Sequence, residues 1–309
     1  MRILVFLERA DVRGGIEVFA ERQVESLRAK GDSVDVVHEL PPSFDGYGEI
    51  IVHKCHDVDV LAMFPPERTA YYVHDHEPIC PRTYAYTPFG RNCSRASGIW
   101  PCAICAPLCR SWKAALGRVL AQGRRKKVMS RFRKIVVISE FMKGRLVANG
   151  IPSEIIVVES PEIAVKAPRD GEERSGVDLL FVGQLIRGKG VQLLLEAMAR
   201  MKKQRTLDVL GAGNMEAKLK ALAWKLGVGE RVRWHGFADN PQGWMRAAKC
   251  VVVPSFWQEP YGLVAAEAVA VGTKVVAFAI GGLPEACGGR ATLVPPGDVD
   301  ALAAALEEA

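Results

Sequence analysis

The chain has 309 residues, of which 49% are hydrophobic and 25% are charged. This composition is typical of globular domains and excludes a disordered, collagen-like or coiled-coil protein. The length favours two domains. No uncharged apolar run reaches the roughly 18 residues that a membrane span needs, and the apolar start of the chain is too short for a signal peptide, so we expect a cytoplasmic protein.

The first half of the chain alternates short apolar runs with helical patterns. Gly14 and Gly15 follow the first run and precede an amphipathic helix that Gly31 ends. A second helix is predicted at residues 140–149. The apolar runs that predict strands are residues 3–7, 34–37, 50–52, 70–73, 135–138 and 155–158.

Residues 160–176 contain Pro, Gly and a run of charges, which indicates a linker. The strand–helix pattern then restarts. Alternating strands and helices predict an α/β fold, here two Rossmann-like parallel-sheet domains facing a cleft, at residues 1–168 and 169–309. The second set of predicted strands is 178–182, 207–210, 232–234, 251–253, 274–278 and 292–294, with helices at 191–203, 215–226, 260–271 and 299–308.

The net charge of +6 is unevenly distributed. Residues 78–139 hold thirteen Lys and Arg and no Asp or Glu, so this stretch favours an anionic partner. Trp112, Ala115, Leu116, Val119 and Leu120 recur at helical spacing among these cations, as in a helix that lies on an anionic membrane surface, and we place this surface at residues 110–134. An anionic acceptor such as a pyrophosphate-linked lipid and a solvated basic helix are the alternatives. Nucleic acid is not expected, because no recognised binding motif accompanies the charge.

Five of the eight cysteines fall in the same stretch. Disulfides are not expected in a cytoplasmic protein, so the CxxC within this cluster suggests a structural zinc ion. Cys80, Cys93, Cys102 and Cys105 are the candidate thiolate ligands. Free thiols that pin a loop are the alternative.

The most informative segment runs from Ser255 to Glu267, between a strand and a helix. Pro260 is expected to open that helix, and Gly262 lets a ligand approach its N-terminus, where free amides suit a diphosphate. Glu259 precedes the helix and Glu267 lies about two turns inside it. Two carboxylates on either side of a phosphate-binding helix start can accept hydrogen bonds from hydroxyl groups, which is the layout of a nucleotide sugar.

This glutamate pair, eight residues apart, resembles the paired-glutamate motif of retaining glycosyltransferases of family 4, which have the two-domain GT-B fold. The resemblance extends over nearly the whole chain. The further motifs that resemble the family are Gly14–Gly15, Val73–Asp75, Phe181–Gly183, Lys189–Gly190 and Gly281–Glu285.

The resemblance implies a role for each matching residue. Glu259 would contact the donor sugar and Glu267 the ribose, while Lys189 would neutralise the departing diphosphate and His74 would lie beside the sugar and the acceptor. The family retains the anomeric configuration and needs no metal for transfer. The catalytic candidates are therefore His74 and Glu259, and the donor-binding candidates are Gly14, Gly15, Gly183, Gln184, Arg187, Lys189, Gly262, Leu263 and Glu267.

The chain departs from the family pattern in two places. Gln184 stands where the family usually has an Arg that shares the diphosphate charge, and Arg187 is the nearest substitute. The chain also ends where family members continue into a helix that crosses back to the first domain, so the second domain is expected to lack that helix.

The expected function is transfer of a sugar from a nucleotide-diphosphate donor to a saccharide or lipid-linked acceptor. The basic stretch suggests a surface-polysaccharide or lipopolysaccharide pathway, with the enzyme peripheral on the inner face of the membrane. A nucleotide-sugar epimerase of similar fold and a non-catalytic nucleotide-sugar-binding subunit are the alternatives.

Overall fold

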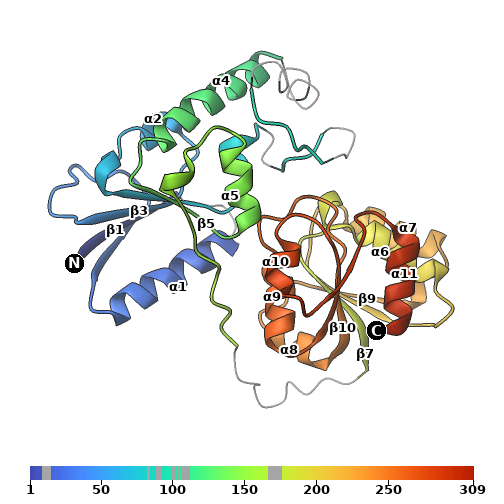
Figure 1. The fold of residues 1–309 in the computed structure, drawn as a ribbon. Coiled ribbons are helices and arrows are strands. Elements are labelled where there is room, and N and C mark those ends of the chain that lie inside the picture. The colour runs from blue at the N-terminus through green and yellow to red at the C-terminus, as the bar shows by residue number, and fades with distance from the viewer. Residues whose placement is uncertain are drawn as a thin grey trace. The chain divides into compact units, whose positions relative to one another are not determined.

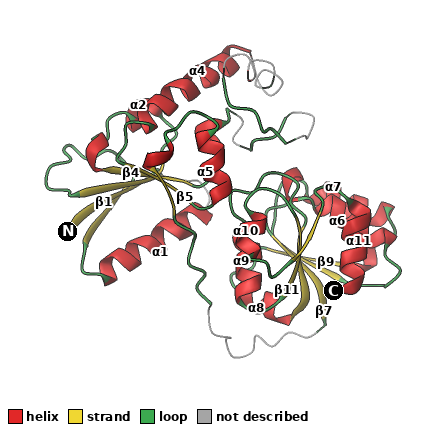
Figure 2. Ribbon diagram, in the orientation of Figure 1, coloured by secondary structure: helices red, strands yellow, loops and turns green. Residues whose placement is uncertain are grey.

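The computed structural model describes residues 1–8, 15–81, 84–87, 92–98, 102, 105, 112–165 and 176–309. The chain divides into two compact units, Met1–Ser160 and Pro161–Ala309. Each unit holds one six-stranded parallel sheet with helices on both faces (Figures 1 and 2). The two-sheet α/β class is therefore confirmed. The predicted boundary at residue 168 lies outside the described residues.

All twelve predicted strands are present, each within three residues of its predicted ends. In the first unit the strands are β1 (Arg2–Leu7), β2 (Ser33–Val37), β3 (Glu49–Lys54), β4 (Thr69–Val73), β5 (Lys134–Val137) and β6 (Ile156–Val158). The described helices of this unit are α1 (Gly15–Ala29), α2 (Val58–Leu61), α4 (Trp112–Met129) and α5 (Glu140–Val147).

The sheet of the first unit has the order β2-β1-β3-β4-β5-β6. Alternate residues of β1 face opposite sides: Ile3 and Val5 pack beneath α1, while Leu4 and Phe6 pack with residues of α2, α4 and α5. Both faces are covered, so the strands are apolar along nearly their whole length. The order in which successive strands are added to the sheet reverses between β1 and β3. In open α/β sheets such a reversal leaves a crevice at the carboxyl ends of the strands, where ligands bind.

In the second unit the strands are β7 (Val177–Val182), β8 (Leu207–Leu210), β9 (Val232–Gly236), β10 (Ala248–Val253), β11 (Lys274–Phe278) and β12 (Thr292–Val294). Its helices are α6 (Val191–Arg200), α7 (Glu216–Lys225), α8 (Pro241–Ala247), α9 (Leu263–Ala270), α10 (Leu283–Cys287) and α11 (Val299–Glu308). The sheet order is β12-β11-β10-β7-β8-β9. This is the order of dinucleotide-binding Rossmann sheets, and its reversal point lies between β7 and β10.

Helix α9 begins later than the sequence predicts. The first helical residue is Leu263, after Gly262, whose φ of 113° is accessible at little cost only to glycine. Pro260 is buried in the preceding loop and does not open the helix. Glu267 consequently lies about one turn inside α9, not two.

Candidate functional site

The loops after β7 and β10 pack against each other through their backbones. The carbonyl of Gly188 accepts hydrogen bonds from the amides of Phe256 (3.1 Å) and Trp257 (3.4 Å). A Cβ atom at Gly190 would lie 1.8 Å from the carbonyl oxygen of Pro254, so only glycine fits there. The reversal point of the sheet is thus formed by two loops in direct contact.

An ion pair joins the two loops at this point. Nζ of Lys189, after β7, lies 2.7 Å from Oε1 of Glu259, after β10. The hydroxyl of Ser255 donates to the same Oε1 at 2.7 Å, and the Lys189 ammonium also lies 5.4 Å from the centre of the Trp257 ring. The structure therefore brings together Lys189 and Glu259, two of the predicted site residues, and adds Ser255, which the sequence analysis did not single out.

Glu259 is ionised at neutral pH although it is only 6% exposed. Its burial opposes ionisation, but the charge of Lys189 and the hydrogen bonds from Lys189 and Ser255 outweigh that burial and hold the pKa below its usual 4.5. A buried carboxylate that keeps its charge is suited to accept hydrogen bonds from hydroxyl groups.

The remaining predicted donor-binding residues of the second unit lie around this pair. Gln184 and Arg187 are exposed on the loop that ends at Lys189 and Gly190. Gly183 begins that loop with a φ of 152°. Gly262, Leu263 and Glu267 lie at the start of α9, half-buried.

Two further glycine segments support these loops. A Cβ at Gly281 would lie 2.4 Å from the carbonyl oxygen of Glu259, and the amide of Gly282 donates to that oxygen at 2.8 Å. Gly211 packs more closely still, with its Cβ position 1.9 Å from the Gly183 carbonyl oxygen. These glycines allow the loops after β8 and β11 to approach the loops that carry Lys189 and Glu259.

In the first unit His74 follows β4 at the carboxyl edge of the sheet, as predicted. Burial lowers its pKa to about 4, so its imidazole is neutral at pH 7. Its Nε2 lies 3.0 Å from Nδ1 of His53 on β3. Burial also raises the pKa of the adjacent Asp75 to about 6. Gly15 is the first residue of α1, and Gly14 lies outside the described residues.

Several polar side chains attach α4 to this edge of the first sheet. The buried Arg125 donates to the carbonyl oxygens of Cys55 (2.7 Å) and His56 (2.5 Å), and its guanidinium lies 3.4 Å from Glu77. Gln122 donates to the Glu77 carbonyl at 2.6 Å. Part of the basic stretch is therefore structural.

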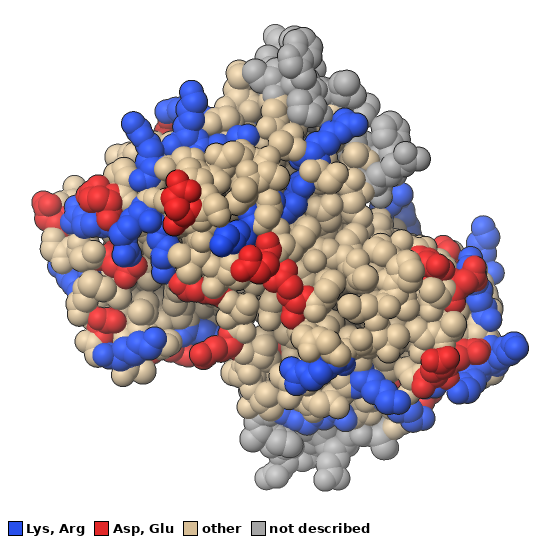
Figure 3. All heavy atoms as spheres, in the orientation of Figure 1, with Lys and Arg blue, Asp and Glu red and all other residues tan. Residues whose placement is uncertain are grey.

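The described face of α4 that points away from the sheet is basic. Figure 3 shows Lys and Arg side chains gathered over the part of the first unit where Figure 1 places α2 and α4. Leu120 is 54% exposed among these cations, whereas Val119 is buried. The predicted apolar stripe is thus divided between the surface and the interior, and the side chains of Trp112, Ala115 and Leu116 lie outside the described set. The exposed cations are Arg118, Arg124, Lys127 and Arg131.

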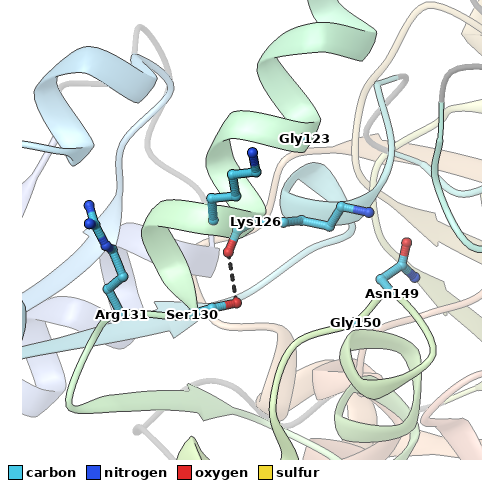
Figure 4. Close-up of a pocket in the computed structure, with 7 residues that line it drawn as sticks. Gly123, Lys126, Ser130, Arg131, Asn149 and Gly150 are labelled. Carbon is cyan, nitrogen blue, oxygen red and sulfur yellow. Dashed lines mark hydrogen bonds between the residues drawn. The ribbon is translucent and has the colours of Figure 1, made fainter.

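A pocket of about 680 Å³ opens at the C-terminal ends of α4 and α5. Figure 4 shows Lys126, Ser130, Arg131 and Asn149 around it, with Ser130 donating to the Lys126 carbonyl at 2.9 Å. Lys127 also lines it. Helix α4 precedes β5 and α5 follows it, so the C-terminal ends of both helices lie at the amino edge of the sheet, on the opposite side from His74.

Among the helices that the structure describes, none combines the length and the apolar character that a membrane span requires.

The four candidate zinc ligands line one small pocket of about 30 Å³, together with other residues of the 92–98 loop. Within the described ranges no group of three or more His, Cys, Asp or Glu is placed to hold a metal ion. Burial raises the pKa of Cys102, and the neighbouring Cys93 and Cys105 raise it further. None of these four described cysteines is in a disulfide, and zinc at Cys80, Cys93, Cys102 and Cys105 stays a prediction.

Comparison with known proteins places this geometry in context. Residues 176–309 match the family model of "Glycosyl transferases group 1". An uncharacterized glycosyltransferase of Methanocaldococcus jannaschii is 36% identical over 149 residues, which are 46% of this chain and 38% of that protein. A D-inositol 3-phosphate glycosyltransferase of Pseudarthrobacter chlorophenolicus is 38% identical over 145 residues, 44% of this chain and 34% of that protein. The chain thus spans about a third of the length of the curated relatives it matches.

Solved structures resemble the whole chain. Anabaena HepE, in a complex with UDP-glucose, superposes with a TM-score of 0.71 at 20% identity and covers 100% of this chain and 89% of its own. WaaG, a glycosyltransferase involved in lipopolysaccharide biosynthesis, gives a TM-score of 0.66 at 16% identity over 99% of this chain and 90% of its own. The chain therefore has the fold of GT-B glycosyltransferases, and its residues 176–309 are similar to the group 1 glycosyl transferases.

Proposed function

We propose that this protein is a retaining glycosyltransferase that takes a sugar from a nucleotide-diphosphate sugar. The observation that carries the proposal is the ion pair of Lys189 and Glu259 at the reversal point of a Rossmann-ordered sheet. Ligands of such sheets bind at that point. Solved structures with the same fold hold UDP or UDP-glucose, which supports a nucleotide sugar as donor.

Each side chain at this point has a defined task in the proposal. Lys189 and Arg187 neutralise the diphosphate as it departs, and the N-terminus of α9 at Gly262 and Leu263 directs free amides at it. Glu259 uses Oε2 to accept a hydrogen bond from a sugar hydroxyl, because Lys189 and Ser255 occupy Oε1. Glu267 accepts hydrogen bonds from the ribose. Side chains and amides supply the positive charge, so the transfer needs no metal.

The first unit would bind the acceptor, with residues 1–168 as the acceptor domain and 169–309 as the donor domain. His74 is the residue expected beside the sugar and the acceptor hydroxyl. Its imidazole is neutral at pH 7, so it can accept a hydrogen bond there. The departing phosphate takes the acceptor proton in the front-face reaction that retains configuration.

The exposed cations of α4 support a lipid-linked or surface-polysaccharide acceptor at an anionic membrane. Lys127, on α4, and Arg131, two residues after its end, flank the pocket of Figure 4, and the exposed Leu120 lies on α4. Cations around an exposed apolar side chain are typical of a helix that rests on anionic lipid. We therefore propose a peripheral position on the inner face of the membrane.

The direct test measures release of nucleoside diphosphate from UDP-, GDP- and ADP-sugars, with and without a lipid-linked saccharide. We expect one donor to be consumed and the release to depend on acceptor. The Glu259→Gln variant should lower the rate at least about 100-fold, whereas Glu230→Gln, an exposed glutamate of the same unit, should leave it unchanged. Conversion of the donor without acceptor would instead indicate an epimerase, and binding without turnover a non-catalytic subunit.

A further inference from the structure

A buried chain of hydrogen bonds leads from α1 to His74. The side-chain oxygen of Gln23, on α1, lies 2.7 Å from Nε2 of His53, on β3. Nδ1 of His53 lies 3.0 Å from Nε2 of His74, which follows β4. His53 is only 2% exposed, so its ring nitrogens need partners within the protein. The proposed function gives Gln23 and His53 no task.

The direction of the protons in this chain follows from Gln23. An amide oxygen only accepts hydrogen bonds, so Nε2 of His53 carries the hydrogen. Burial and the neighbouring His74 lower the pKa of His53 well below 6.5, so this ring has one hydrogen and its Nδ1 is an acceptor. Nε2 of His74 must then donate to it. Nδ1 of His74 is left as an acceptor.

Aromatic packing fixes the rings in this arrangement. The Phe19 ring, also on α1, lies 5.1 Å from His74 and 5.9 Å from His53 in T-shaped geometry. The two imidazoles are stacked at 5.2 Å, and Tyr72 lies 4.9 Å from His53. Rotation of either ring would have to displace these neighbours, so the tautomer and the orientation are set together.

We propose that Gln23 and His53 are positioning residues that hold His74 as the neutral Nε2–H tautomer, with Nδ1 as a hydrogen-bond acceptor for a hydroxyl of the sugar or of the acceptor. The use of that acceptor rests on the proposed function, whereas the tautomer does not. His53 lies on β3, at the β1–β3 reversal point of the first sheet where this fold places ligands, and His74 follows the next strand, β4.

The test is ¹⁵N NMR of histidine-labelled full-length protein, which assigns the tautomer of each ring. We expect His53 and His74 to be Nε2–H tautomers at pH 7. Gln23→Leu should remove this preference from His53 and shift the tautomer population of His74, while Gln23→Glu, which still accepts a hydrogen bond, should preserve it. Glu25→Ala, an exposed change on the same helix, is the control. An Nδ1–H tautomer at His74 in the unaltered protein would overturn the proposal even if every variant failed to fold.

A second readout concerns the reaction. Gln23→Leu should lower kcat about tenfold, the size of effect seen when a group that orients a ligand is removed, with the donor KM nearly unchanged and with rescue in Gln23→Glu. A kcat within twofold of the unaltered protein would overturn the positioning role. Absence of sugar transfer in the unaltered protein, with the expected tautomers present, would overturn the proposed function and leave the assignment of Gln23 and His53 supported.

Discussion

Nζ of Lys189 lies 2.7 Å from Oε1 of Glu259, although 70 residues separate them in the chain. The pair joins the loops after β7 and β10, which are neighbouring strands of the sheet. Both partners are largely shielded from water, with side-chain exposures of 22% and 7%. The two charges are thus present and paired in the protein alone, and in the proposed function the diphosphate of the donor would contact the same ammonium.

This burial predicts that the pair stabilises the second unit. Lys189→Ala leaves the Glu259 carboxylate buried beside Ser255 without its cation, and removing one partner of a buried pair typically lowers the free energy of unfolding by about 3 kcal/mol. Lys220→Ala breaks an exposed pair with Glu216 of equal length, 2.7 Å, and should lower it by about 0.5 kcal/mol or less. Urea unfolding of the two variants checks the difference, and equal losses would contradict it.

Gly190 is predicted to be irreplaceable for steric reasons. Its φ is 75°, and a Cβ would lie 1.8 Å from the Pro254 carbonyl oxygen, so Gly190→Ala must separate the two loops that carry Lys189 and Glu259. Gly227 has a similar φ of 71° with no atom within 4 Å of its Cβ position. Gly227→Ala should therefore lower the free energy of unfolding by only about 1 to 2 kcal/mol, and Gly190→Ala by distinctly more, with loss of donor binding. Thermal unfolding of both variants measures this difference, and equal losses of stability would contradict the role of the close contact at Gly190.

Acidification is predicted to change the stability of the folded protein in opposite directions through two adjacent residues, His74 and Asp75. The pKa of His74 is lowered to about 4, so the unfolded chain binds a proton that the folded chain does not, and His74 makes stability fall as the pH drops from 6.5 towards 4. The pKa of Asp75 is raised to about 6, so this carboxyl makes stability rise as the pH drops from 6 towards 3.8. Asp75→Asn removes the second effect and leaves the first.

The stability of Asp75→Asn should consequently fall more steeply between pH 6.5 and pH 4.5 than that of the unaltered protein. Urea midpoints at several pH values in this range measure the two slopes. Parallel slopes would mean that Asp75 titrates at its ordinary value.

The basic end of α4 is predicted to bind anionic lipid. Each cation near such a surface contributes about 1 kcal/mol, so Lys127→Glu combined with Arg131→Glu should weaken binding to phosphatidylglycerol vesicles at least about tenfold. Lys218→Glu combined with Lys225→Glu, exposed on α7 of the second unit, is the charge-matched control. Co-sedimentation at two salt concentrations tests this, since the binding should also weaken with salt. Equal loss in both double variants would indicate that net charge alone is responsible.

The sheets could be predicted from the sequence because their strands are buried on both faces and read as apolar runs between turns. The short helices α2, α8 and α10 were missed, although Pro241 and Pro284 mark the first turns of two of them. The start of α9 was placed at Pro260 because proline favours that position. The left-handed backbone at Gly262 decides otherwise, and a sequence does not show which glycine adopts it.

The candidate site was predicted in part. Lys189, Glu259 and His74 were singled out by motifs, and the structure places the first two in contact. Ser255, His53 and Gln23 were missed because their roles depend on contacts that only the folded sheet creates. His53 directly follows the predicted strand 50–52, and its place one strand away from His74 was the available signal. Zinc at the four cysteines stays a prediction, because spacing alone does not fix where the sulfur atoms lie.

The most direct test of the account is a calorimetric titration of UDP, GDP and ADP into the unaltered protein, Lys189→Ala, Glu267→Ala and the control Lys218→Ala. We expect one nucleotide to bind, Lys189→Ala and Glu267→Ala each to weaken its binding about tenfold or more, and the control to leave its binding unchanged. Binding that is unaffected by both variants, or absent in the unaltered protein, would contradict a donor site at the β7–β10 reversal point.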